Sequence, residues 1–337
     1  MSDKKCWRLL TLNCHEAWVH QLGYLDARVD IIDGLPNRYT PSWDTHVRPV
    51  PANARLISLE AAHAPGNRYD CVIAHNMTDL MDVKLVAAAR IIVFHATLEG
   101  RLAVDAAADE PQRISGIIRR YLTLTGGIGV AVSSMKGRSW GFPDDVVPNG
   151  VDCDAYLPWS GEVAAGVRVA NQIQQKRRIL AWDFHERAFA DLPVTIVGHN
   201  PEMPGVAPSE SWDDLKGLLR RHRFFIHTAH PDLEDGYNMA SLEAMAAGLP
   251  ILGNRHPTSP VVHGVSGFLA ETPDELNGLA KRLIDDRELA AHMGEEARRQ
   301  VRKEFDISLF SRRFHRAIDK AVRQYRRLGK GGGGGRR

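Results

Sequence analysis

The chain has 337 residues, of which 44% are hydrophobic and 25% charged, with a formal net charge of +2. This is the composition of an ordinary globular protein, and the length predicts two domains. No run of eighteen apolar residues is present, and the N-terminus carries no apolar segment typical of a signal peptide. Four scattered cysteines argue against a disulfide or zinc framework, so we expect a cytoplasmic protein with reduced thiols.

The charge is unevenly distributed along the chain. Residues 298–337 contain fourteen Lys or Arg and three acidic residues, a local net charge of +11. Such an arm is attracted to anionic surfaces, and we expect peripheral contact with the inner face of the cell membrane, with no nucleic acid as partner. The alternative is a solvated basic helix face. The Gly-rich basic end, residues 329–337, is predicted to be disordered.

The first half alternates short apolar runs with segments of helical periodicity. Strands are expected at 8–12, 29–33, 54–59, 69–76, 90–97 and 128–134, and helices at 78–89 and 111–125. This alternation predicts βα units and a parallel sheet. Polar residues at the strand ends would lie at the carboxyl edge of that sheet, where open α/β sheets bind ligands.

The second half repeats the pattern. Strands are expected at 166–171, 193–198, 223–229 and 250–254, and helices at 176–190, 211–222, 240–248 and 272–286. A linker rich in Pro, Gly, Asn and Asp places the domain boundary near Pro158. The sequence therefore predicts an α/β protein with two Rossmann-like doubly wound domains facing a cleft, residues 1–158 and 159–310. A helix at 311–328 is expected to pack back on the first domain.

One segment, EDGYNMASLEAMAAGLP at 234–250, combines carboxylates with the start of a short helix. The helix is expected to end at Gly248, with Pro250 just beyond. Its free N–H groups and dipole favour an anion. Carboxylates beside an anion site would repel the anion unless they bind something else, and sugar hydroxyls are good donors to Asp235 and Glu243. The segment thus predicts a charged ligand rich in hydroxyl groups.

This segment resembles the donor site of retaining GT-B glycosyltransferases of the GT4 group, the glycosyl transferases group 1. The family pattern Glu-Gly-Phe-Gly-x-x-x-x-Glu-Ala-Met-Ala-x-Gly-x-Pro stands here with Asp235 in place of the first acid and Asn238 in place of the second glycine. Residues 146–158, 194–201 and 259–286 resemble further family motifs in the same order. The first half matches only in its βα rhythm, and LNCHEAWVH replaces the family's Gly-Gly loop.

The resemblance implies roles for particular residues. Lys176 stands at the family's diphosphate-binding lysine, whereas Asn171 replaces its arginine, so Arg168 or Arg177 would supply the missing charge. Glu243 would hold the ribose hydroxyls, and Asp235 the donor sugar. The backbone N–H groups of residues 236–240 would hold the diphosphate with Lys176. The donor-binding set includes Gly236, Tyr237, Asn238, Met239, Ala240 and Gly198.

Other strand-end residues complete the predicted site. In the family a histidine near His95 touches the donor sugar, so Lys176, Asp235 and His95 form the catalytic set implied by the resemblance. Residues expected to bind the acceptor are Asn13, His15, His75 and Asn76.

No metal site or cofactor is expected, because no Asp-x-Asp pair precedes a loop. His222, His227 and His230 surround one strand and need not converge.

The resemblance implies a hexosyltransferase that moves a sugar from a nucleotide-diphosphate sugar to an acceptor hydroxyl, with retention of anomeric configuration. The acceptor would be a carbohydrate or lipid-linked molecule. Two alternatives stay open. One is a sugar phosphorylase or nucleotide-sugar epimerase on the same two-domain plan. The other is a degenerate relative that binds a nucleotide or a partner without transfer, which the departures at Asp235, Asn238 and Asn171 favour.

Overall fold

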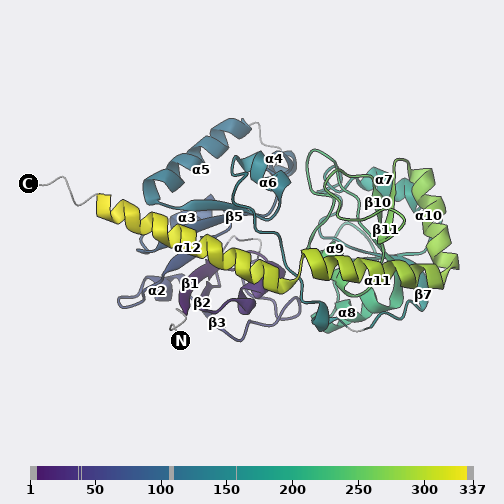
Figure 1. The fold of residues 1–337 in the computed structure, drawn as a ribbon, viewed down its shortest axis with the longest axis horizontal. Helices are drawn as coiled ribbons and strands as arrows, with labels where there is room; N and C mark the ends of the chain where they lie inside the picture. Colours follow the sequence, from purple (N-terminus) through teal and green to yellow (C-terminus); the bar gives the residue numbers. More distant parts are fainter. Residues whose placement is uncertain (1–5, 37, 39, 106–109, 157, 332–337) are drawn as a thin grey trace, which may run out of the picture. The chain divides into compact units, whose positions relative to one another are not determined.

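The computed structural model describes residues 6–331 except 37, 39, 106–109 and 157. The chain divides into two compact units (Figure 1). Unit 1 comprises Met1–Thr97, Ala108–Pro148 and Phe310–Arg337, and unit 2 comprises Leu98–Ala107 and Asn149–Leu309. In the linker, the chain passes from unit 1 to unit 2 after Pro148, whereas the sequence placed this boundary near Pro158.

Unit 1 is built on a six-stranded sheet in the order β3-β2-β1-β4-β5-β6. Every pairing is parallel. This order places the topological switch point between β1 and β4, where consecutive crossovers leave in opposite directions. The strands are β1 Trp7–Leu12, β2 Ala27–Ile32, β3 Ala54–Ile57, β4 Cys71–Ala74, β5 Ala89–Phe94 and β6 Ile128–Ala131.

Five helices of unit 1 follow its strands, as βα units require: α1 Glu16–His20, α2 Leu59–His63, α3 Met77–Asp82, α5 Pro111–Thr125 and α6 Ser134–Trp140, with a 3₁₀ turn at Gln21–Tyr24. Helix α12, Ile307–Gly331, comes after unit 2 in the chain, and from Phe310 on it belongs to unit 1. Leu10, Leu12, Ile32 and Val72 of the sheet pack with Ala62 of α2 in one buried cluster. The alternation of strand and helix in the sequence therefore yields the parallel sheet that it predicts.

Unit 2 contains a five-stranded parallel sheet in the order β11-β10-β9-β7-β8, with its switch point between β9 and β7. Its core has two parts. In one part of the core, α8, α9 and α11 pack against the sheet. In the other part, α7 and α10 pack against it. The strands are β7 Val163–Val169, β8 Val194–Val197, β9 His222–Ile226, β10 Ile251–Asn254 and β11 Gly267–Ala270. The helices are α4 Leu98–Asp105, α7 Trp182–Ala188, α8 Trp212–Arg221, α9 Met239–Ala246, α10 Pro273–Asp285 and α11 Arg287–Glu304, with a 3₁₀ turn at Cys153–Ala155.

Two helices are shorter than their sequence patterns predict, and β11 has no predicted counterpart. The helix expected at 78–89 ends at Asp82, because Ala89 already pairs in β5. The helix expected at 176–190 begins only at Trp182. Before it, the Leu180 carbonyl accepts hydrogen bonds from the Thr228 hydroxyl (2.6 Å) and the Arg168 guanidinium (3.2 Å). The Leu180 carbonyl is thus bonded to side chains distant in sequence, whereas in a longer helix it would accept a backbone N–H.

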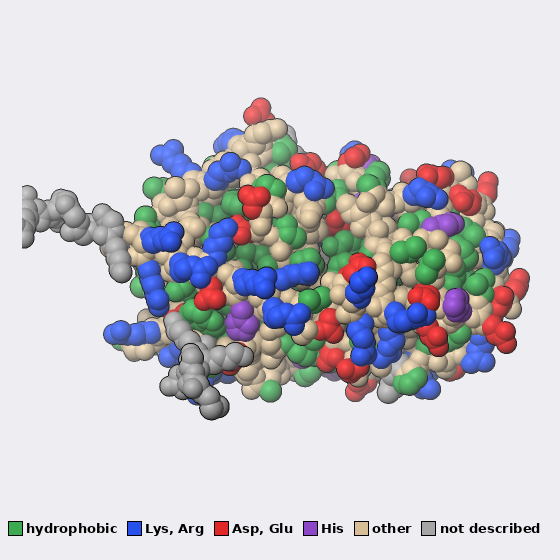
Figure 2. All heavy atoms as spheres, viewed as in Figure 1, with side chains coloured by type: hydrophobic (Ala, Val, Ile, Leu, Met, Phe, Trp, Pro, Cys, Tyr) green, Lys and Arg blue, Asp and Glu red, His purple; other side chains and the backbone are tan. Residues whose placement is uncertain are grey.

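Helix α12 is amphipathic, with one apolar and one basic face. Its buried residues recur at helical spacing: Phe310, Phe314, Ala317, Ile318, Ala321 and Val322. The opposite face exposes Arg312, Arg316, Lys320, Arg323, Arg326 and Arg327. Figure 2 shows Lys and Arg side chains gathered along this helix. Contact of the basic face with an anionic surface stays a prediction. Of the tail expected at 329–337, residues 329–331 end α12, and residues 332–337 lie outside the described part.

The apolar face of α12 contacts Trp18, which is 2% exposed. Phe310 and Phe314 meet the indole edge-on, with ring centroids 6.2 and 5.8 Å away. Edge-to-face aromatic pairs add stabilisation beyond the area they bury. The C-terminal helix is therefore part of the core of unit 1. Within the described residues, no helix is both long and apolar enough to cross a membrane.

We predict that Phe314→Ala destabilises unit 1 by about 3 kcal/mol or more, because it leaves a cavity beside Trp18. Hydrogen exchange of peptides from β1 and β4 measures this loss separately from unit 2. Arg316→Ala, on the exposed face of the same helix, is the matched control and should change protection little. Equal protection in both variants would show that α12 does not support the sheet.

Candidate functional site

The predicted donor residues lie after strands that flank the switch point of unit 2. Lys176 follows β7, whereas Asp235 and Gly236 follow β9, and these strands are neighbours in the sheet. Parallel strands end at the same edge, so the two loops share the carboxyl edge of unit 2. Burial lowers the pKa of Lys176, and the nearby Glu234 carboxylate opposes that shift. The ammonium group of Lys176 therefore lies near enough to the acidic segment to respond to its charge.

Asn238 caps helix α9. Its backbone is extended, with φ −143°, and its side chain accepts the Ser241 N–H at 2.8 Å. In return, the Ser241 hydroxyl oxygen accepts the Asn238 N–H at 2.8 Å. The family's second glycine is thus replaced by a residue that favours the helix start.

Gly236 is held against the loop after β10. A Cβ atom at this position would lie 2.8 Å from both His256 Nδ1 and the Ser259 nitrogen, so a side chain would clash there. The Gly236 N–H donates to the Thr258 hydroxyl at 2.9 Å. Two of the N–H groups predicted for the diphosphate, those of Gly236 and Asn238, are therefore already used within unit 2. Fewer backbone N–H groups at this helix start are thus left for an anion than the sequence predicts.

The two acids of the segment differ in position. Asp235 precedes α9 and is 1% exposed, whereas Glu243 lies on α9 and is 8% exposed. The Asp235 carbonyl is 3.2 Å from His227 Nε2. Gly248 follows the helix with φ +84°, the left-handed conformation that favours glycine, which confirms the predicted helix end. Both carboxylates are thus held in buried surroundings on either side of the helix start.

The loops after β7 and β8 are joined by asparagine side chains. The Asn171 side chain accepts the His199 N–H at 2.8 Å, and Asn200 accepts the Ile173 N–H at 2.8 Å. Gly198 has φ +140°, and a Cβ atom there would lie 2.2 Å from the Ala170 carbonyl oxygen. Asn171, which stands where the family has arginine, and Gly198 therefore shape the backbone that precedes Lys176.

Gln172 has a strained backbone in this same loop. Its φ is +55°, an uncommon value for a residue other than glycine. The Lys176 N–H donates to the Gln172 carbonyl at 2.9 Å, and the Gln172 N–H donates to the His199 carbonyl at 2.9 Å. Strained backbone of this kind clusters at ligand sites.

Arg168 is directed into the interior of unit 2 and not toward the loops. Its side chain donates to the Thr228 hydroxyl at 2.7 Å and approaches His185 Nδ1 at 3.2 Å. Its guanidinium lies over Trp182, 5.1 Å from the ring centroid. Burial lowers the pKa of Arg168. These contacts contradict the expectation that Arg168 neutralises a diphosphate, because they use the guanidinium to join β7, β9 and α7.

Arg177 is also held by other side chains. Its guanidinium pairs with Asp183 at 2.6 Å and with Glu186. Hydrogen bonds that Arg177 donates to the Glu186 carboxylate raise the pKa of Arg177. Arg177 thus pairs with two acidic residues of α7. Of the three cations predicted for the diphosphate, only Lys176 shows neither a side-chain hydrogen bond nor an ion pair among the described contacts.

The strand-end residues of unit 1 gather at one edge but have different partners. Asn13 donates to Glu16 Oε1 at 3.1 Å, and Asn76 caps α3 by accepting the Asp79 N–H at 2.9 Å. Asn13 is buried, and His15 is exposed at the start of α1. The asparagines predicted to bind the acceptor therefore serve the local fold, and His15 has the most accessible side chain of the predicted set.

His75 and His95 are bonded to each other. His75 Nδ1 lies 2.9 Å from His95 Nε2, and His75 Nε2 lies 3.1 Å from the Thr11 hydroxyl. Burial lowers the pKa of His75 to about 3 and that of His95 well below its usual value. Both imidazoles are therefore neutral near physiological pH. Cys14 joins this pair from the end of β1, a neighbour that sequence reasoning missed.

The histidines set aside as metal ligands have separate partners. His222 Nε2 lies 2.8 Å from the Thr195 hydroxyl, and His230 Nδ1 accepts the Asp232 N–H at 3.2 Å. In the described part of the chain, the group of potential metal ligands is Cys14, His75 and His95. The prediction that His222, His227 and His230 do not form a site is consistent with these contacts.

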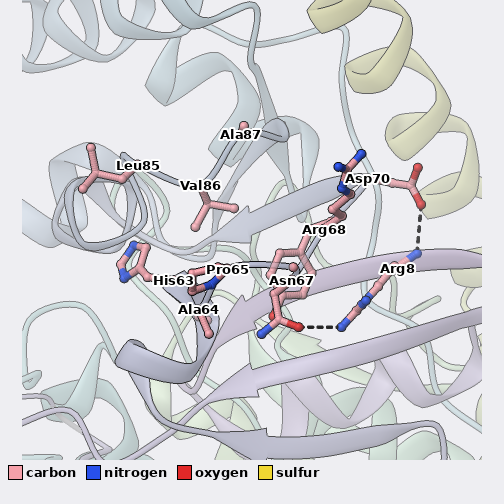
Figure 3. A pocket seen from close by; sticks show the side chains of 13 residues that line it. Arg8, His63, Ala64, Pro65, Asn67, Arg68, Asp70, Leu85, Val86 and Ala87 are labelled. Atoms are coloured by element: carbon pink, nitrogen blue, oxygen red, sulfur yellow. Dashed lines mark hydrogen bonds between the residues drawn. The ribbon is translucent and has the colours of Figure 1, made fainter.

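A cavity of about 880 Å³ opens at the opposite edge of the unit 1 sheet (Figure 3). Arg8 at the start of β1, Asp70 before β4 and Ala87 before β5 line it. Arg8 donates to Asn67 Oδ1 at 2.9 Å, and its backbone N–H donates to Asp70 at 3.1 Å. The cavity is therefore at the amino edge and contains none of the predicted site residues.

The segment that carries α9, with Asp235 before it and Glu243 on it, can also be compared with known proteins. Residues 200–300 match the family model of glycosyl transferases group 1. A 77-residue stretch, 21% of this chain, is 39% identical to N-acetyl-alpha-D-glucosaminyl L-malate synthase of Bacillus anthracis. A 97-residue stretch, 27% of this chain, is 31% identical to the MMP alpha-(1->4)-mannosyltransferase of Mycolicibacterium hassiacum. The two matches span 20% and 24% of those relatives' own lengths.

The whole fold has solved counterparts. HepE of Anabaena, a structure in complex with UDP and glucose, is similar with a TM-score of 0.64 and 14% identity. The similarity covers 93% of this chain and 99% of that chain. Two parallel sheets with flanking helices and this likeness confirm the predicted GT-B fold class.

We predict that Asn238→Ala destabilises the start of α9 by about 1 kcal/mol, because the cap of the Ser241 N–H is lost. For a unit of this size the melting temperature should fall by about 2–4 °C in thermal unfolding followed by circular dichroism. Asn238→Gly, which restores the family residue, should cost only a few tenths of that energy. A glycine variant as unstable as the alanine variant would contradict the capping role.

Proposed function

We propose that this protein is a glycosyltransferase that moves a sugar from a nucleotide-diphosphate sugar to an acceptor hydroxyl, with retention of configuration. The observation that carries the proposal is the carboxyl edge of unit 2. There Lys176 and the Glu234–Asp235 segment flank the switch point, and Glu243 lies on the helix that follows. The family match covers the acidic segment and this helix. The UDP and glucose of the HepE structure support a nucleotide donor.

The chemistry assigned to each group follows from its charge. A nucleoside diphosphate leaves with growing negative charge, and a cation held beside it stabilises the transition state. Lys176 supplies that cation from the strained loop after β7. Glu243 accepts hydrogen bonds from the ribose hydroxyls, and Asp235 from hydroxyls of the donor sugar. The shorter side chain of Asp235, where the family has Glu, suits a different spacing between carboxylate and sugar.

The acceptor is proposed to be a carbohydrate or lipid-linked molecule that binds unit 1. The carboxyl edge of that unit offers His15 and the neutral imidazole of His75, both of the predicted acceptor set. A neutral imidazole can donate and accept hydrogen bonds, which suits sugar hydroxyls.

A second candidate is a relative that binds a nucleotide without transfer. The engagement of Arg168 and Arg177 favours it, because the family's second cation has no substitute in either residue. Release of nucleoside diphosphate from UDP-glucose and other nucleotide sugars, with and without added acceptors, separates the two. Tight nucleotide binding without any release of diphosphate would favour the binding protein.

We predict that Lys176→Ala lowers kcat by about a hundredfold or more, the scale of one lost electrostatic stabiliser. Glu243→Ala should mainly raise the KM for the donor, because its contact is equally strong in the ground and transition states. Initial rates of nucleoside diphosphate release measure both. Arg177→Ala is the matched control, since its charge is paired within α7, and should leave both constants nearly unchanged. If Lys176→Ala and Glu243→Ala also leave them unchanged, the donor site is elsewhere.

Transfer should persist in excess EDTA, because Lys176 and the start of α9 take the place of a metal ion at the diphosphate. Rates are compared before and after chelation, and again after adding Mg²⁺ or Mn²⁺. Loss of activity in EDTA that is restored by either ion would contradict the metal-independent mechanism.

A further inference from the structure

Three potential metal ligands converge at the switch point of unit 1. Cys14 follows β1, His75 follows β4 and His95 follows β5, and these three strands are adjacent in the sheet. One ligand atom from each residue lies within 4.8 Å of the others. With Zn–N distances of about 2.0–2.1 Å and Zn–S of about 2.3 Å, ligand atoms in a tetrahedral site lie roughly 3.3–3.7 Å apart. The cluster therefore needs only small side-chain shifts to surround an ion.

Hydrogen bonding sets the tautomer of His75. The Thr11 hydroxyl donates its proton to the Ile73 carbonyl at 3.0 Å, so its oxygen must accept from His75 Nε2 at 3.1 Å. The neutral ring then carries its proton on Nε2, and Nδ1 presents a lone pair toward His95 Nε2 at 2.9 Å. Metal-binding histidines are typically oriented in this way, by a bond from their other nitrogen.

Both rings are also held by packing. Trp18 contacts His75 and His95 edge-on, with ring centroids 5.1 and 4.9 Å away. His75 is buried, whereas Cys14 and His95 are half-buried. Packing against Trp18 therefore holds the orientation of both imidazoles.

Charged groups of both signs lie near the cluster. The Asp79 and Glu16 carboxylates act on Cys14, whereas the Lys136 ammonium acts on His95. The affinity for a metal ion therefore depends on the three ligands themselves. Asp79 itself is held by Arg38 at 3.5 Å and by the His75 N–H at 2.9 Å.

We propose that Cys14 Sγ, His75 Nδ1 and His95 Nε2 bind one thiophilic divalent metal ion of the Zn²⁺ class, with a fourth ligand from solvent. Thiolate and imidazole ligands select Zn²⁺ and Co²⁺ over Mg²⁺ and Ca²⁺, which prefer oxygen. On binding, the Cys14 thiol loses its proton to solvent, and the His95 proton passes from Nε2 to Nδ1 by exchange with solvent. One proton is released for each ion bound.

This site goes beyond the proposed function and does not depend on it. It differs from a metal at the donor diphosphate, because its ligands come from unit 1 and include a thiolate. An ion here would occupy Nε2 of His95, the histidine that the family resemblance places against the donor sugar. The metal-free cluster, with its bond between the two histidines, is the state compatible with transfer in EDTA.

The test is a Co²⁺ titration of the full-length protein without an affinity tag, after chelation and reduction by a phosphine. We expect a thiolate-to-cobalt charge-transfer band in the near ultraviolet that saturates at one equivalent. One equivalent of Zn²⁺ should abolish it, and excess Mg²⁺ should not. Cys14→Ser should remove the band, whereas the exposed Cys6→Ser, the matched control, should retain it.

Two further variants keep the test decisive. Thr11→Val retains all three ligands but removes the acceptor for His75 Nε2–H, and should weaken Co²⁺ binding by about 10- to 100-fold. If Cys14→Ser does not fold, as judged by circular dichroism, His95→Gln takes its place and should also lose tight binding. Absence of the band in the wild-type protein, or its persistence in the folded Cys14→Ser or His95→Gln variant, would overturn the proposal.

Discussion

Every strand pairing in both sheets is parallel, and this constraint places the chemistry of the molecule. Parallel strands all end at one edge, so the residues that follow them meet although they are far apart in sequence. In unit 2 the loops after β7 and β9 bring Lys176 to the acidic segment before α9. In unit 1 the ends of β1, β4 and β5 bring Cys14 to two histidines. Each cluster lies at the switch point of its own sheet.

Desolvation decides which cations of unit 2 are available to a ligand. Arg168 is 2% exposed and is held by Thr228, Leu180 and Trp182, so removing it to meet a diphosphate would strip a buried charge of its partners. Arg177 is held at the surface by two carboxylates. Lys176 is partly buried without such a set of bonds, and its interaction with Glu234 opposes the effect of burial on its pKa. Of the three cations predicted for the diphosphate, Lys176 is therefore the one that the described contacts leave available.

Trp18 joins two parts of unit 1 that the sequence separates by almost the whole chain. One side of the indole meets Phe310 and Phe314 of α12, and another meets His75 and His95. The packing of the C-terminal helix therefore supports the ring that orients both histidines. Dense packing transmits such displacements, because a well-filled core has little free volume to absorb them.

The sequence by itself determined the elements and their order. Apolar runs separated by helical patterns predicted parallel sheets, because local periodicity and turn residues act within a few positions. The segment from Asp235 to Glu243 indicated a donor site through its resemblance to a known family. Only the tertiary structure decided how side chains are used. Arg168 and Arg177 lie close to Lys176 in sequence, yet burial and carboxylate partners engage both of them elsewhere. Cys14 carried no signal of its own, because its two partners become neighbours only when three strands pair. Hydrogen bonds and desolvation depend on atoms that folding brings together. They therefore cannot be inferred from the spacing of residues along the chain.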